Sequence, residues 1–155
     1  MAASLIVKNF SDGVILIEDG TGTPLNYTCT FDEGNLTISG LAQQQNEVVT
    51  YESRGTLKSI RHTGRTYPSG SFSLMLTDVS DSTDKTLIDI LLKQNSFSAA
   101  VSTNGANSDV YTVKITLTVA GTAHGDSANH TFVMNNTHCN SLDVAEGDPN
   151  TVTVN

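Results

Sequence analysis

The sequence YTVKITLTV, residues 111–119, has the clearest periodicity in the chain. Every second residue is apolar or aromatic, and threonine or lysine stands between these residues. Because side chains alternate between the two faces of a β-strand, this pattern predicts a strand with one buried and one exposed face. Tyr111, Val113, Ile115, Leu117 and Val119 are expected to point into the core.

The same period of two recurs in shorter segments elsewhere in the chain. Asp12-Gly13 separates the first two segments and is a typical hairpin turn. The predicted strands are 5–8, 14–17, 25–31, 36–38, 70–77, 111–119, 132–134 and 151–154. Seven or eight short strands separated by turns predict a mainly β fold, either a sandwich or a barrel.

One segment has helical spacing instead. Leu87, Ile90 and Leu91 lie on one stripe of a helix, which predicts a single α-helix of about three turns at about 84–94. Three residues before it have side chains that accept hydrogen bonds from free helical N–H groups. Asp81, Ser82 and Asp84 are therefore expected to cap the helix.

Residues 40–70 show no clear period and hold four of the eight basic residues of the chain. A segment of this length without regular structure is unusual inside a small domain, so we expect a long extended loop. We interpret it as an arm that contacts an acidic surface of another copy. A solvated loop and a contact with phosphates are the alternatives. The arm residues are Glu47, Arg54, Lys58, Arg61 and Arg65.

Length and charge restrict the function. A chain of 155 residues predicts one domain, residues 1–155. The formal net charge of −8 argues against free binding to nucleic acid and against adhesion to an anionic membrane. We expect no signal peptide and no membrane-spanning segment, because the longest apolar runs are too short.

The sequence offers no catalytic or cofactor motif, and we expect neither an enzyme nor a cofactor. His124, Asp126, His130, His138 and Cys139 lie within sixteen residues of one another. Their spacing does not match a facial triad, so we expect no metal site. Cys29 and Cys139 are expected to be free thiols.

Several features, taken in order, resemble the tail tube (major tail) protein of long-tailed bacteriophages. The similar segments are the arm at 54–59, the strand at 70–74, the helix at 86–92, the strand at 111–120, and the turn at 146–150 before the last strand. The resemblance rests on the order and spacing of these segments and covers most of the chain.

The resemblance implies a structural protein that assembles into hexameric rings, which stack into a tube for DNA delivery into the host. The strands of neighbouring subunits would join into one inner barrel, and the arm would reach the adjacent ring. The implied partners are other copies of the chain and the tape-measure, tail-terminator and tail-tip proteins. DNA would pass through the lumen without specific binding, and no membrane would be involved. The protein would be made and assembled in the host cytoplasm and reside in the virion tail.

The acidity has a mechanical interpretation in such a tube, because a weakly negative wall lets DNA slide without sticking. We expect that many of seven acidic residues contribute negative potential, some of them to the lumen: Asp12, Glu18, Asp19, Asp32, Glu33, Asp109 and Asp126. Two other classes remain open: a head-decoration or other virion structural protein, and a carbohydrate-binding β-sandwich. The second is less favoured because the chain has no Trp to form a sugar-binding platform.

Overall fold

The computed structural model describes residues 13–30, 33–40, 46–65, 67–77, 79 and 83–155. Predicted strand 5–8 lies outside these residues, as does half of the Asp12-Gly13 turn. The described residues form ten antiparallel strands and one short α-helix, which confirms the mainly β class. The chain divides into two compact units, one made of Met1–Asn35 with Phe72–Asn155 and the other of Leu36–Ser71.

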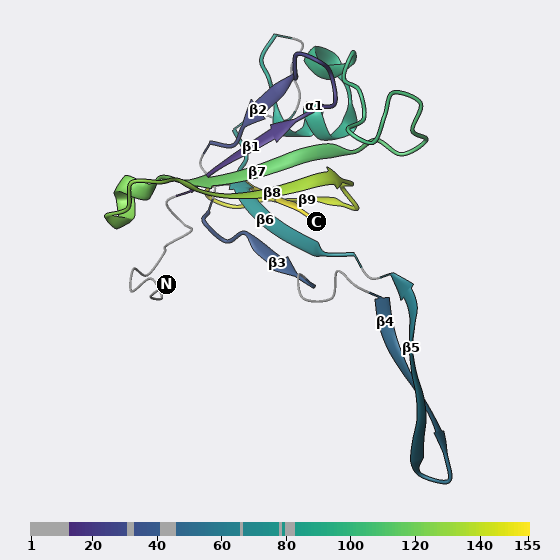
Figure 1. Cartoon of the computed structure of the whole chain (residues 1–155). Coiled ribbons are helices and arrows are strands. Elements are labelled where there is room, and N and C mark those ends of the chain that lie inside the picture. Colours follow the sequence, from purple (N-terminus) through teal and green to yellow (C-terminus); the bar gives the residue numbers. More distant parts are fainter. Residues whose placement is uncertain (1–12, 31–32, 41–45, 66, 78, 80–82) are drawn as a thin grey trace. The chain divides into compact units, whose positions relative to one another are not determined.

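The first sheet of the larger unit has the strand order β2-β1-β7-β8 (Figure 1). Its strands are β1 (Gly13–Glu18), β2 (Asn26–Thr28), β7 (Val113–Val119) and β8 (His130–Thr137). In β7, Val113, Ile115, Leu117 and Val119 are all buried, as the alternation predicts. The register places Ile15 opposite Leu117 and Ile17 opposite Ile115, so the apolar faces of β1 and β7 coincide.

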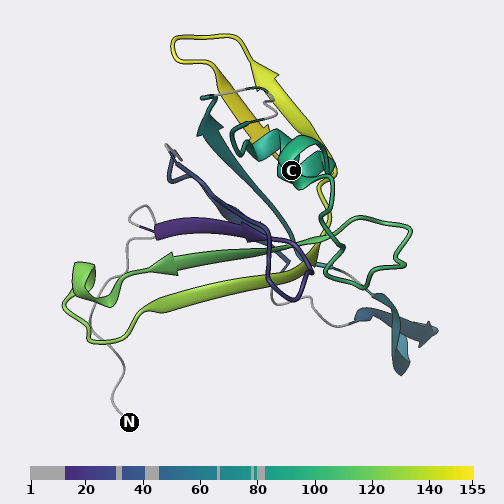
Figure 2. The same ribbon diagram turned by 90° about the horizontal axis from the view of Figure 1, so that it is seen from above.

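The second sheet contains β6 (Ser69–Met75), β9 (Leu142–Ala145) and β10 (Thr151–Val154). Phe72 and Leu74 of β6 lie opposite Val154 and Val152 of β10, and all four side chains are buried. The first residues of β6 pair instead with β3 (Thr37–Ser39), within the smaller unit. Figure 2 shows the two sheets of the larger unit as separate layers.

The helix is shorter than predicted and begins later. α1 spans Leu87–Leu92, and its N-cap is Thr86, whose hydroxyl accepts a hydrogen bond from the Asp89 N–H at 3.1 Å. The prediction that Asp84 caps the helix is wrong, because Asp84 lies two residues before the cap and is exposed. Asp81 and Ser82 lie outside the described residues. The predicted stripe of Leu87, Ile90 and Leu91 is buried.

Most of the described residues between 40 and 70 are paired in strands. β4 (Asn46–Ser53) and β5 (Thr56–Arg65) form an antiparallel hairpin, so the prediction of a long extended loop is wrong for these residues. β9 was not predicted from the sequence. None of the helices among the described residues is long and apolar enough to cross a membrane.

Candidate assembly surfaces

The β4–β5 hairpin turns at Arg54 and Gly55. Both residues have positive φ angles, 53° and 75°, which is the backbone of a two-residue hairpin turn matched to the twist of the strands. Glycine adopts this conformation without strain, but for arginine the left-handed region costs about 1–2 kcal/mol. Arg54 therefore occupies the tip of the hairpin at an energetic disadvantage.

A β-bulge decides which side chains share a face of this hairpin. Thr50 lies opposite Ile60 and Glu52 lies opposite Leu57, so two residues of β4 span three of β5, with a register shift between Tyr51 and Glu52. The extra residue lies in β5 and brings Leu57 and Ile60 onto one face, although they are three positions apart. Their exposed fractions are 50% and 58%. We call this the apolar face of the hairpin.

The opposite face is polar and aromatic. Tyr51 lies opposite Ser59, and Val49 lies opposite Arg61. The guanidinium of Arg61 stands over the Tyr51 ring, with the carbon 6.0 Å from the ring centroid, so this pair forms a cation–π contact. The two faces of the hairpin therefore differ in chemistry, and the large exposed aliphatic side chains belong to the first.

The hairpin brings together most of the predicted arm residues. Arg54 is at the tip, Lys58 follows Leu57 on β5, and Arg61 lies further along the same strand, all three exposed. In the backbone register, Glu47 lies opposite Thr63 and Arg65 opposite Asn46. The side chains of Glu47 and Arg65 lie outside the described residues.

No third strand pairs with β4 or β5 among the described residues. A two-stranded ribbon alone is marginally stable in water, because neither face is covered. Ten residues of β5 at about 3.3 Å each give a ribbon of roughly 30 Å. Such a ribbon, with large apolar side chains half exposed, is typical of an element that becomes covered by a partner.

The β9–β10 hairpin has the opposite charge. Asp143, Glu146 and Asp148 are exposed, and residues 139–155 contain no lysine, arginine or histidine. β9 is the outer strand of its sheet, and Val144 on it is 57% exposed. The Asp143 carboxylate accepts hydrogen bonds from the Ser141 hydroxyl at 3.2 Å and the Asn155 amide at 2.9 Å, which orient it near the start of β9.

The acidic residues predicted to contribute negative potential have different environments. Asp19 is only 3% exposed, so its carboxylate does not face solvent. Its carboxylate accepts hydrogen bonds from the N–H groups of Leu25 at 2.7 Å and Val101 at 2.9 Å, and from Thr21. Asp19 therefore joins the β1–β2 connection to the segment at 101–105.

The remaining residues of that predicted acidic set differ in exposure and in their partners, and the exposed Glu33 carboxylate accepts a hydrogen bond from the Asn35 amide at 3.1 Å. Glu18 forms an ion pair with Lys114 at 2.7 Å, across the β1–β7 ladder, so much of its charge is neutralised. Asp126 lies 3.2 Å from His130. Glu33 and Asp109 are exposed. Asp12 and Asp32 lie outside the described residues.

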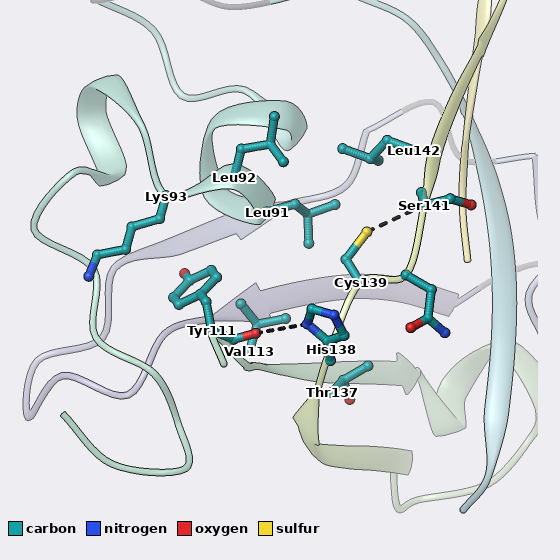
Figure 3. Close-up of a pocket in the computed structure, with 11 residues that line it drawn as sticks. Leu91, Leu92, Lys93, Tyr111, Val113, Thr137, His138, Cys139, Ser141 and Leu142 are labelled. Carbon is teal, nitrogen blue, oxygen red and sulfur yellow. Dashed lines mark hydrogen bonds between the residues drawn. The ribbon is translucent and has the colours of Figure 1, made fainter. Parts of the chain in front are cut away.

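A pocket of about 390 Å³ lies between the end of α1 and the segment that joins β8 to β9 (Figure 3). Leu91, Cys139 and Leu142 point toward one another within it, and Tyr111 and Val113 line it from the β7 side. The wall therefore combines aliphatic and aromatic side chains with polar ones. Its size lies within the range typical of ligand-binding pockets.

Polar groups of the pocket wall are held by backbone carbonyls. His138 Nδ1 lies 3.2 Å from the Tyr111 oxygen, and the Cys139 thiol donates to the Ser141 carbonyl at 3.4 Å. Burial raises the pKa of the Cys139 thiol, and the nearby Asp143 carboxylate raises it further. Burial also raises the pKa of Tyr111 to about 12, with a smaller contribution from Asp19. The Tyr111 hydroxyl is buried without a hydrogen-bond partner in the described part of the chain.

The cluster considered for metal binding is divided in space. Asp126 and His130 lie next to each other, whereas His138 and Cys139 line the pocket described above. The His124 side chain lies outside the described residues. No group of three or more His, Cys, Asp or Glu side chains that could hold a metal ion occurs in the described part of the chain. Cys29, which is buried, and Cys139 form no disulfide with each other.

In comparisons with known proteins, no family model, no curated protein and no solved structure matches the chain.

Proposed function

We propose that this chain is a structural protein that assembles with copies of itself into stacked hexameric rings, forming the tube of a phage tail through which DNA passes. The observation that carries the proposal is the β4–β5 hairpin. It has no third strand among the described residues, and it exposes Leu57 and Ile60 beside Arg54, Lys58 and Arg61. Such a ribbon gains stability when a second molecule covers its apolar face.

Open sheet edges support the ring. β8 is the outer strand of the first sheet, has eight residues, and exposes Val133 to 48%. A long outer strand presents unpaired N–H and C=O groups to another chain, and closure of several subunits into a ring removes such edges. The ring would thus be formed by strand pairing, and the hairpin would connect successive rings.

Charge supports the role as a conduit. With a net charge of −8, the assembled wall would repel DNA phosphates weakly and would lack the basic stripe needed for tight binding. Glu33 and Asp109 are the exposed residues of the predicted acidic set that we assign to the lumen. In the virion tail, the tube would contact tape-measure, tail-terminator and tail-tip proteins at its core and its ends.

The experiment is a concentration series of the purified protein, followed by negative-stain electron microscopy and light-scattering mass. Hollow tubes of uniform width are expected. The triple variant Arg54→Glu, Lys58→Glu, Arg61→Glu should stay folded and form no tubes, because its hairpin would repel the acidic surface it contacts. Asp84→Lys changes an exposed charge outside the hairpin and serves as the control that still forms tubes.

A protein that stays monomeric at every concentration, with wild-type and variant indistinguishable, would contradict the tube. That result would favour a head-decoration protein, which binds an existing capsid lattice. Binding of the labelled protein to capsids would then be the direct test of that second function.

A further inference from the structure

The apolar face of the β4–β5 hairpin and the pocket beside α1 are complementary in chemistry. Leu57 and Ile60 are exposed aliphatic side chains on one face of a narrow ribbon. The pocket is concave, has a volume of about 390 Å³, and is lined by Leu91, Val113 and Leu142. Burial of two aliphatic side chains in such a pocket is the main source of affinity in small docking contacts.

The charges beside the two surfaces are complementary as well. Lys58 follows Leu57 directly, and Arg54 lies at the hairpin tip. Asp143 follows Leu142 of the pocket directly, and its carboxylate lies close enough to raise the pKa of the Cys139 thiol. Glu146 and Asp148 continue the negative charge along the β9–β10 turn. A hairpin with its apolar face in the pocket would therefore place basic residues against acidic ones.

We propose that the pocket between α1 and the start of β9 is the receptor for the β4–β5 hairpin of a second copy, with Leu57 and Ile60 inserted and Lys58 facing Asp143. The inference rests on the proposed function and names the surface that the hairpin contacts. Val144 lies two residues after Leu142, on the same face of β9, and is 57% exposed, so it extends the apolar contact along that strand. Lys93 marks the far end of the pocket, at the end of α1.

The native Cys139 makes the contact directly testable. A cysteine at position 57 in the docked hairpin would lie beside the Cys139 thiol of the neighbouring copy, and a disulfide forms only when the two Cα atoms are within about 7 Å. The variant Leu57→Cys is mixed as a minor component with wild-type protein, so that assembly does not depend on the substituted residue. After assembly, the mixture is treated with diamide and separated without reductant.

The proposal predicts a covalent dimer of the variant with wild-type protein, reversed by dithiothreitol and lost when the wild-type partner carries Cys139→Ser. Thr56→Cys is the matched control, because Thr56 is the neighbouring residue, is also exposed, and points to the opposite face of the hairpin. It should give no dimer. Wild-type protein alone should give none either, because Cys29 is buried and a docked wild-type hairpin, which has no cysteine, would cover each Cys139.

An exchange of charges tests the contact between Lys58 and Asp143. Lys58→Asp should raise the critical concentration for assembly about 5-fold. Adding Asp143→Lys to the same chain should bring the critical concentration most of the way back to the wild-type value. Two results would overturn the docking site and leave the proposed function intact. One is that tubes form but Leu57→Cys gives no covalent dimer, and the other is that Thr56→Cys gives as much covalent dimer as Leu57→Cys. Wild-type protein that never assembles would overturn both.

Discussion

Replacing Asp19 by asparagine tests whether its carboxylate stabilises the fold or faces solvent, as a residue of a channel wall would. Asp19 Oδ2 accepts the Val101 N–H at 2.9 Å, and Oδ1 accepts the Leu25 N–H at 2.7 Å together with two bonds from Thr21. An asparagine in the same place has one acceptor oxygen. Whichever way the amide is turned, its NH₂ group faces a backbone N–H that has lost its acceptor.

The expected loss of stability follows from these contacts. A hydrogen bond to a charged group contributes about 1.5–3 kcal/mol, and leaving a buried N–H without an acceptor costs a similar amount. We expect Asp19→Asn to reduce the free energy of unfolding by about 3 kcal/mol, since the side chain is only 3% exposed. With a urea m-value of about 2 kcal/mol/M, the unfolding midpoint should fall by about 1.5 M.

The assay is urea unfolding followed by circular dichroism, with Asp109→Asn as the control. Asp109 is exposed, so its replacement should change the free energy by less than about 0.5 kcal/mol. A shift for Asp19→Asn no larger than that of the control would refute the reasoning. Asp19 would then behave like a solvent-facing carboxylate.

Two further substitutions test the hairpin tip and the pocket. Arg54→Asn should slow hydrogen exchange of the β4–β5 amides about 5-fold, because asparagine tolerates the positive φ of 53°. The same variant should form shorter tubes, because the hairpin tip loses its charge. Faster exchange would contradict the claim that Arg54 strains the turn. For Tyr111, burial raises the pKa from 10.0 to about 12, so the folded protein keeps the phenol proton at a pH where the unfolded chain has lost it. The free energy of unfolding should therefore fall as pH rises from about 10 toward 12, and Tyr111→Phe should show a smaller fall in parallel urea titrations. An identical pH dependence in the two proteins would rule out Tyr111 as its source. Since the Tyr111 hydroxyl is buried without a partner among the described residues, the same variant should be no less stable at neutral pH.

The strands that could be predicted are those in which the alternation also determines burial. Val113 to Val119 alternate in sequence and in exposure, because one face of β7 packs in the core. β9 was missed because its four residues are half or fully exposed, so burial imposes no alternation on the sequence. The helix start was misplaced because Asp81, Ser82, Asp84 and Thr86 are all residues of capping type. Residue type alone does not show which of the four is the N-cap, whereas the backbone geometry identifies Thr86.

The two proposed surfaces depend on long-range pairing and could not be predicted from local pattern. Val48-Val49-Thr50-Tyr51 before Arg54-Gly55 is a hairpin signal in retrospect, but arginine is an uncommon residue at a positive φ angle. The bulge that places Leu57 and Ile60 on one face exists only in the register between β4 and β5. The pocket joins residues 91–93 to residues 137–142, which are separated by more than forty positions.

In the proposed assembly, one chain carries both the hairpin and its receptor, and this determines what kind of assembly can form. A contact between two different surfaces of identical molecules leaves one free hairpin and one free receptor on every pair, so it continues until geometry closes it or produces a filament. Pairing between the outer strands of neighbouring subunits closes a ring around an axis. If the hairpin contact runs along that axis, the two interactions are independent, and each ring offers six hairpins to the next. Weak single contacts then combine into strong attachment between rings, because all of them form together once two rings are aligned. A marginally stable, strained hairpin suits this arrangement, since in the proposed tube a neighbouring ring would cover the apolar face that the hairpin leaves exposed.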